Sequence, residues 1–139
     1  RCGMNFNAMW LRNRTTKTNG VSYIMQKGGA EVFTPEGQAQ IKANIQIYKN
    51  NAKVVMEALD QLVIWYTGGK NAPYICLKCP KGMGSWEFFD YHLNEIQVVG
   101  TPGEGFGACG EGYFRFSTFG SPEDTKEAAR RLCELLGGK

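Results

Sequence analysis

The sequence is poor in the residues that build metal and redox sites. It contains one histidine, His92, and five cysteines scattered along the chain. Cys76 and Cys79 form a Cys-x-x-Cys pair, but no second pair follows, and on a strand residues three apart point to opposite faces. We therefore expect no metal site. The odd number of cysteines is typical of reduced thiols in a cytosol-like compartment.

Long apolar runs and a strong net charge are also missing. No stretch approaches the about 18 apolar residues of a transmembrane helix, and the first residues do not resemble a signal peptide. The formal net charge of +3 is too small by itself to indicate nucleic acid. We therefore expect neither a membrane nor a nucleic acid as a partner. Basic residues do gather early, as a solvated surface or a phosphate site: Arg12, Arg14, Lys17 and Lys27.

With 139 residues the chain is one domain or a piece of one. Turn residues and apolar periodicity predict helices over 6–17, 21–33, 35–62 and 85–96, and a last helix capped by Ser121. Ser85 is the expected cap of the helix over 85–96. Strands are predicted over 63–66, 73–78, 98–99 and 113–119. This order is typical of an α+β layer, a small and mostly antiparallel sheet with helices on one face.

The predicted helix over 35–62 is unusually long. Thr34 can cap it, Pro35 fits the first helical position, and Glu36 favours the positive end of the helix dipole. Apolar residues then recur in steps of three and four, at Ile41, Ile45, Tyr48, Ala52, Val55 and Leu59. We expect one continuous element whose C-terminal half packs on the sheet. Helices of this length often connect subdomains.

The segment Tyr113-Phe114-Arg115-Phe116-Ser117 places an arginine in an aromatic run that alternates like a strand. In period two, Phe114 and Phe116 face one way and Arg115 faces the other. A guanidinium is always charged, and its planar fork suits a carboxylate held by two parallel hydrogen bonds. Arg115 is therefore a candidate residue for binding a substrate carboxylate. The alternative is a structural ion pair with Glu111 or Glu104.

A glycine-rich stretch from Gly103 to Gly112 leads into this strand. Glycine lets a backbone come close to a small ligand. The spacing Gly103-x-Gly105-x-Gly107 is not a dinucleotide-binding signature, because it precedes a strand and not a helix. The stretch is consistent with a ligand site next to Arg115.

Six short motifs follow one another along most of the chain, from Leu11 onwards. They are TTKTNGVSY at 15–23, TPEG at 34–37, GxNAPYI at 69–75, SWEFFD at 85–90, VVGTPGxGFG at 98–107 and GEGYFR at 110–115, where x is a position outside the match. In this order they resemble the C-terminal part of fold-type I, pyridoxal-phosphate-dependent aminotransferases. More narrowly, they resemble the LL-diaminopimelate aminotransferase family. Between Cys2 and Trp10 the sequence is about 20 residues shorter than the family pattern, judged from the usual length of the connecting loop and strand.

The resemblance implies a domain organisation. Residues 1–33 would be a remnant of the large, cofactor-binding domain and of the dimer interface, 34–62 the interdomain helix, and 63–139 the small C-terminal domain. The parent enzyme would be a homodimer. Segment 4–33 would then have lost its neighbours, so we expect the 139-residue chain to associate with itself.

The resemblance also implies roles for single residues. Arg115 would bind the substrate α-carboxylate, and Asn19 would contact substrate and cofactor in an active site shared between subunits. Arg1 matches an arginine that contacts the cofactor phosphate. The Schiff-base lysine would lie upstream, so this chain would hold no catalytic residue, and Lys17, Lys27 and Lys70 do not occupy its motif.

Two functions follow from these observations. The first is the C-terminal portion of an enzyme of lysine biosynthesis, in the cytoplasm or in a plant or algal plastid. That enzyme would transfer an amino group between LL-diaminopimelate and 2-oxoglutarate through pyridoxal phosphate. The 139-residue chain alone is expected to be inactive without the lysine. The second is a non-catalytic small-domain remnant that acts as a binding or structural module.

Overall fold

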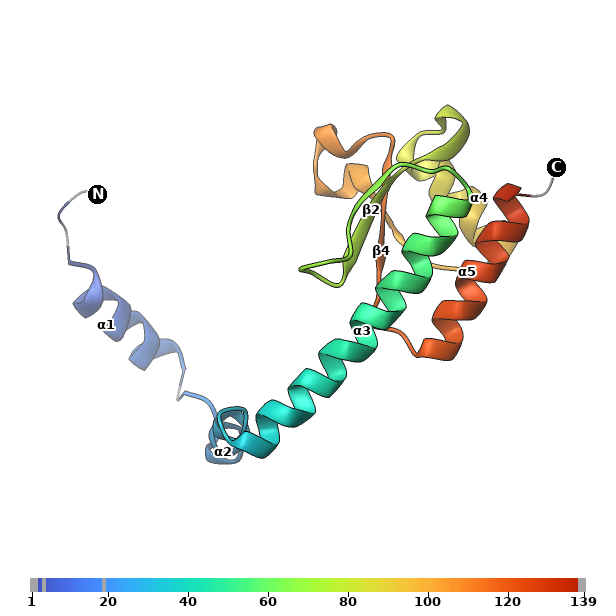
Figure 1. The fold of residues 1–139 in the computed structure, drawn as a ribbon. Coiled ribbons are helices and arrows are strands. Elements are labelled where there is room, and N and C mark those ends of the chain that lie inside the picture. The colour runs from blue at the N-terminus through green and yellow to red at the C-terminus, as the bar shows by residue number, and fades with distance from the viewer. Residues whose placement is uncertain (1–2, 4, 19, 138–139) are drawn as a thin grey trace. The chain divides into compact units, whose positions relative to one another are not determined.

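The computed structural model describes residues 3, 5–18 and 20–137 (Figure 1). It divides into two compact units, Arg1–Lys42 and Ala43–Lys139, and each is described by itself. The helices are α1 (Asn7–Lys17), α2 (Tyr23–Glu31), α3 (Pro35–Gln61), α4 (Ser85–Ile96) and α5 (Pro122–Gly137). The strands are β1 (Tyr66–Gly68), β2 (Tyr74–Lys78), β3 (Thr101–Pro102) and β4 (Tyr113–Ser117).

The first unit consists of α1, α2 and the start of α3. The helices predicted over 6–17 and 21–33 are confirmed, and neither α1 nor α2 contains a buried residue. Thr34 caps α3 as expected, because its Oγ1 accepts a hydrogen bond from the Gly37 N–H at 3.0 Å.

Helix α3 is one continuous element, as its apolar periodicity predicted. It ends in two nested backbone hydrogen bonds: the Val63 N–H donates to the Asp60 carbonyl at 3.1 Å, and the Ile64 N–H donates to the Leu59 carbonyl at 3.0 Å. Val63 takes the left-handed conformation that this ending requires, with φ of 54°. The strand predicted from Val63 was therefore wrong at its start, and β1 begins only at Tyr66.

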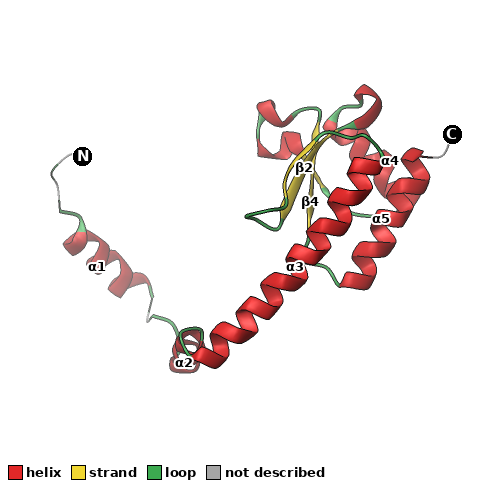
Figure 2. Cartoon of the chain, viewed as in Figure 1, coloured by secondary structure: helices red, strands yellow, loops and turns green. Residues whose placement is uncertain are grey.

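The second unit contains a four-stranded sheet in the order β1-β2-β4-β3, and every neighbouring pair is antiparallel (Figure 2). The strand predicted at Val98 and Val99 was wrong. The Val98 carbonyl instead accepts a hydrogen bond from His92 Nδ1 at 2.7 Å, and Val99 is 72% exposed. The third strand follows at Thr101, where the backbone first pairs with β4.

The core lies between one face of this sheet and the three helices α3, α4 and α5 (Figure 1). β2 and β4 supply Ile75, Leu77, Phe114 and Phe116, and the helices supply residues such as Leu59, Phe88 and Leu132. Burying each such side chain stabilises the fold by about 1.5–3 kcal/mol. The predicted α+β class, with helices on one face of a small antiparallel sheet, is confirmed.

Ser85 does not cap α4, contrary to the prediction from sequence. The N-cap residue is Gly84. The hydroxyl of Ser85 is buried and lies within hydrogen-bond distance of two backbone carbonyls, that of Tyr113 at 2.9 Å and that of Gly110 at 3.1 Å. The free N–H of Ser85 is satisfied from elsewhere in the chain, by the carboxylate of Glu111 at 3.1 Å. The carboxylate of Glu111 therefore accepts a hydrogen bond at the start of α4, where the Ser85 hydroxyl was expected to act as the cap.

The start of α5 follows its sequence signal. Ser121 Oγ accepts a hydrogen bond from the Asp124 N–H at 3.0 Å, and Pro122 occupies the first helical position. The predicted cap is confirmed.

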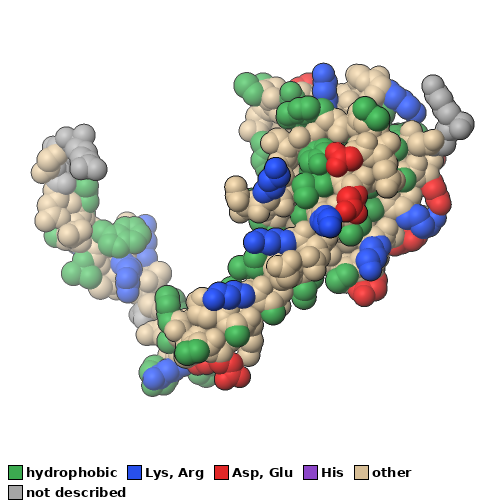
Figure 3. Space-filling view, viewed as in Figure 1, with side chains coloured by type: hydrophobic (Ala, Val, Ile, Leu, Met, Phe, Trp, Pro, Cys, Tyr) green, Lys and Arg blue, Asp and Glu red, His purple; other side chains and the backbone are tan. Residues whose placement is uncertain are grey.

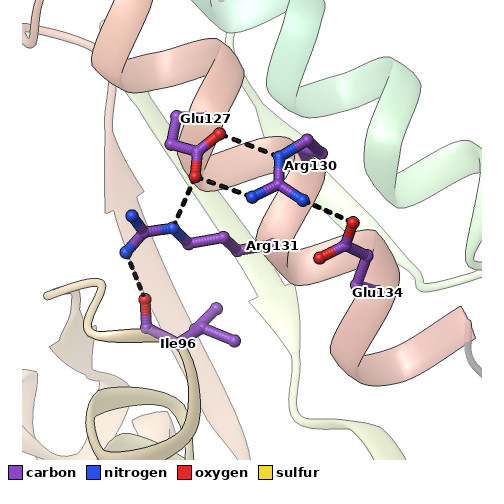
Figure 4. Close-up of polar contacts among 5 residues, drawn as sticks. All are labelled: Ile96, Glu127, Arg130, Arg131 and Glu134. Atoms are coloured by element: carbon purple, nitrogen blue, oxygen red, sulfur yellow. Dashed lines mark hydrogen bonds and ion pairs between the residues drawn. The ribbon is translucent and has the colours of Figure 1, made fainter.

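Helix α5 carries a network of charged side chains on its surface (Figure 4). Glu127 accepts hydrogen bonds from Arg130 and Arg131, and Arg130 also pairs with Glu134. Arg131 donates to the Ile96 carbonyl at 3.1 Å, which links α5 to the end of α4. The hydrogen bonds from Arg130 and Arg131 lower the pKa of Glu127 to about 2.

Among the described residues, no helix is long and apolar enough to cross a membrane. On the face of the second unit shown in Figure 3, basic and acidic side chains are interspersed.

Candidate carboxylate-binding site

Strand β4 places Arg115 in the middle of the sheet face that the helices leave open. Phe114 and Phe116 are buried on the core side, while Arg115 is half-buried on the other side, as the alternation predicted. Its register partners are Cys76 on β2 and Thr101 on β3. The guanidinium therefore emerges from a central strand, whose backbone is held by neighbours on both sides.

Two aromatic rings lie against this guanidinium. Its Cζ is 4.5 Å from the centroid of the Tyr74 ring and 4.3 Å from that of Phe106. Both separations are within the range of cation–π attraction. Tyr74 begins β2, and Phe106 ends the short helix η2 (Gly103–Phe106) in the glycine-rich stretch. Reasoning from sequence missed both residues, although alternation along β2 could have placed Tyr74 on the face of Arg115.

Arg115 is not part of an ion pair within the described ranges of the chain. The pairs found there join Lys53 with Glu57 and connect residues of α5. Glu111, one proposed alternative partner, is engaged as the cap of α4. The Nε atom of Arg115 is buried without a hydrogen-bond partner. The structural ion pair with Glu111 or Glu104 is thus not formed among the described residues.

The glycine-rich stretch closes on itself next to the site. Gly103 and Gly110 pack backbone against backbone, and a Cβ atom on either would collide with the carbonyl oxygen of the other. Gly107 adopts φ of 121°, which side-chain-bearing residues rarely take. These glycines allow the loop to fold tightly and to place Phe106 over the sheet.

Two other reactive side chains, those of His92 and Cys79, are buried. His92 is fully buried against the rings of Phe88, Phe114 and Phe116, and this burial lowers its pKa. Burial, with the nearby negative charge of Glu111, raises the pKa of the Cys79 thiol to about 11. No group of three or more potential metal ligands was found in residues 3, 5–18 and 20–137.

The remaining predicted site residues cannot be placed in this site. Arg1 and Asn19 lie outside the described residues. Lys17, Lys27 and Lys70, which were not assigned to the site, are exposed. Of the residues proposed to bind substrate or cofactor, the described structure therefore locates Arg115.

The fold corresponds to part of a fold-type I aminotransferase, and the chain is related to the pyridoxal-phosphate-dependent aminotransferases. More particularly, it is homologous to the C-terminal portion of LL-diaminopimelate aminotransferases. It is 51% identical over 133 residues to the enzyme of that name from Azobacteroides pseudotrichonymphae genomovar. CFP2, covering 96% of this chain and 33% of the relative. It is 52% identical over 130 residues to the one from Lawsonia intracellularis, covering 94% and 32%.

A solved structure agrees with the sequence comparison. The structure superposes on L,L-diaminopimelate aminotransferase from Chlamydomonas reinhardtii with a TM-score of 0.89 and 42% identity, over 94% of this chain and 32% of that one. No protein-family model matches the chain. The chain thus spans about a third of the length of the curated relatives it matches.

Proposed function

We propose that this chain is the C-terminal portion of an enzyme that transfers an amino group between LL-diaminopimelate and 2-oxoglutarate. The supporting observation is the guanidinium of Arg115, which lies on the open sheet face without an internal carboxylate partner in the described part of the chain. The similarity to enzymes named for this substrate supports the assignment. The domain boundaries would be those expected from the resemblance, with residues 63–139 as the small domain.

Arg115 would bind the α-carboxylate that both substrates carry. Its fork of N–H donors matches the two oxygens of a carboxylate, and a bidentate pair fixes orientation as well as position. Placement on a central strand, with Cys76 and Thr101 as register partners, would keep the guanidinium at a constant height above the sheet. The same residue would therefore orient the amino donor and the amino acceptor alike.

The cofactor would be pyridoxal phosphate, which when bound supplies the electron sink for amino transfer. Asn19 and Arg1 are the residues of this chain that the resemblance places near it, and both lie outside the described residues. We expect the lysine that holds the cofactor to come from the part of the enzyme that precedes this segment. The enzyme would be a homodimer in the cytoplasm, or in a plastid if the source is a plant or alga.

The test is an assay of the complete gene product that contains this segment. Its coding sequence upstream of Arg1 should specify a Ser-x-Ser-Lys-type motif, and the purified protein should convert LL-diaminopimelate and 2-oxoglutarate. Replacement of Arg115 by Ala should abolish this activity, because the α-carboxylate of each substrate would lose its partner. An active Arg115→Ala enzyme would exclude the proposed role.

The second candidate function is a non-catalytic small-domain module. The observation in its favour is that the second unit, Ala43–Lys139, has its own core, formed by α3, α4, α5 and the sheet. A native product that starts near Arg1 would support this function in place of the first.

A further inference from the structure

The rings of Tyr74 and Phe106 contact the Arg115 guanidinium but, unlike a carboxylate, carry no charge that would neutralise it. At 4.3 Å and 4.5 Å, the Phe106 and Tyr74 rings attract the guanidinium through their electron-rich faces. A ring carries no carboxylate oxygen, so these contacts form no ion pair with the N–H donors of the guanidinium. An ion pair would have occupied the donors, whereas aromatic contacts fix the direction in which they point.

The two rings are held in different ways. Tyr74 belongs to β2, pairs in register with Ser117, and packs edge-on against Phe119 at 5.7 Å. Phe106 ends η2 in the glycine-rich loop, and the residue is 60% exposed. Tyr74 is thus built into the sheet, while Phe106 depends on the backbone of its loop for its position.

That backbone is tightly constrained. The Gly107 N–H donates to the Glu104 carbonyl at 2.9 Å, and the Gly110 N–H donates to the Gly107 carbonyl at 2.8 Å. The close packing of Gly103 on Gly110 closes the loop at its base. A loop closed in this way holds a single exposed ring against a charged side chain on the neighbouring strand.

We propose that Phe106 is a positioning residue for carboxylate recognition. Its ring, together with that of Tyr74, fixes the plane of the Arg115 guanidinium, so that the edge of the fork meets a planar carboxylate with both N–H groups. Arginine side chains lose considerable rotamer freedom when they bind, and a pre-oriented guanidinium loses less. The inference rests on the proposed function in one respect, the assignment of Arg115 as the carboxylate-binding residue.

The experiment follows Arg115 by nitrogen-15 NMR in the 139-residue chain and measures ligand binding with the complete gene product that contains it. The first readout is the rate of rotation about the Cζ–Nε bond of Arg115 without ligand, and the second is the affinity of the complete gene product for 2-oxoglutarate. Phe106→Leu should accelerate the rotation and weaken 2-oxoglutarate binding about two- to fivefold, the equivalent of one exposed cation–π contact. Phe106→Tyr should restore both values, because it keeps the ring.

Trp86→Leu is the matched control. Trp86 is another exposed aromatic residue, but it lies on α4, packs against Phe89, and is not one of the rings found against Arg115. This variant should leave both readouts unchanged. Unchanged rotation in Phe106→Leu, or faster rotation with unchanged affinity, overturns the inference.

The proposed function fails in a different way. If Arg115→Ala in the complete gene product binds 2-oxoglutarate as tightly as the unmodified protein, Arg115 does not bind the carboxylate, whatever the rotation rate shows. If Arg115→Ala loses binding while Phe106→Leu keeps it, the proposed function stands and the positioning role is wrong. Absence of measurable binding to the unmodified gene product counts against both.

Discussion

The side-chain amide of Asn51 donates a hydrogen bond to the backbone carbonyl of Thr118 at 3.1 Å, 67 residues along the chain. The same amide donates to the Gly120 carbonyl at 2.8 Å. Asn51 is on α3 and is 2% exposed, and the two carbonyls belong to the segment between β4 and α5. One buried side chain therefore joins the long helix to the end of the strand that carries Arg115.

Replacement of Asn51 by Ala should destabilise the chain by about 2–4 kcal/mol, because two carbonyls would lose their donor and one is buried. Asn51→Asp should be at least as harmful at neutral pH, since a carboxylate keeps the shape but has no N–H to donate. The measurement is the midpoint of urea unfolding. The exposed neighbour Asn50 serves as the control, and Asn50→Ala should change the stability by no more than about 0.5 kcal/mol. Equal effects at both positions would contradict the role assigned to Asn51.

Replacement of Arg115 by Lys in the complete enzyme should lower kcat/KM by the equivalent of about 2–4 kcal/mol, the cost of disrupting a desolvated charge pair. Lysine keeps the charge but loses the planar fork. Steady-state kinetics with LL-diaminopimelate would measure the effect, and Lys78→Arg, an exposed change on the neighbouring strand, is the control. An unchanged kcat/KM in Arg115→Lys would refute the role of the fork.

The purified 139-residue chain should show no amino transfer between LL-diaminopimelate and 2-oxoglutarate. The reason is that the chain lacks the motif of the Schiff-base lysine, which serves as nucleophile and proton carrier in this chemistry. A coupled assay for glutamate formation, with added pyridoxal phosphate, would detect turnover. Turnover that increases with the concentration of the chain would contradict this prediction.

The stability of the second unit should fall as the pH drops below the ordinary pKa of histidine, 6.5. Burial lowers the pKa of His92 in the folded state, so the unfolded chain binds a proton first. The contribution of neutral His92 to the free energy of unfolding is complete above pH 6.5, and it is lost as the pH falls from there toward the lowered pKa of the folded state. Urea unfolding between pH 8 and pH 5.5 would measure the slope.

His92→Phe should flatten this slope, because phenylalanine does not titrate. Glu127 affects the stability at lower pH than His92 does. Its pKa is lowered from an ordinary 4.5 to about 2, so its contribution is present above pH 4.5 and is lost only as the pH falls toward 2. A slope above pH 5.5 that survives in His92→Phe would show that another group is responsible.

The isolated chain should associate with itself. Large apolar side chains in the first unit are exposed, including Met9, Trp10, Leu11, Val21, Tyr23, Ile24 and Met25. An exposed apolar patch of this kind marks an interface or an aggregation site. Analytical ultracentrifugation over a range of concentrations would reveal the association, and a combined Trp10→Ser and Ile24→Ser variant should reduce it. A monomer at all concentrations, with residues 5–33 protected from hydrogen exchange, would show that the segment buries itself.

The sequence predicted a structural feature correctly where the residues that determine that feature lie close together in the chain. The cap at Thr34, the apolar periodicity of α3 and the cap at Ser121 are contained within a few residues, and the structure follows them. The alternation around Arg115 likewise assigned the two faces of β4, because side chains on a strand alternate whatever their neighbours are. The ordered motifs, in turn, indicated the family.

Only the tertiary structure decided the points that depend on residues far apart in the sequence. At the start of α4 the N-cap residue is Gly84, not Ser85, and the Ser85 N–H donates to the carboxylate of Glu111, 26 positions away. The left-handed ending at Val63 delayed β1, because the last carbonyls of α3 needed partners. At the candidate site, Tyr74 and Phe106 meet Arg115 through strand pairing and loop closure. No local pattern specifies such a meeting, because it depends on where separate segments of the backbone come together in space.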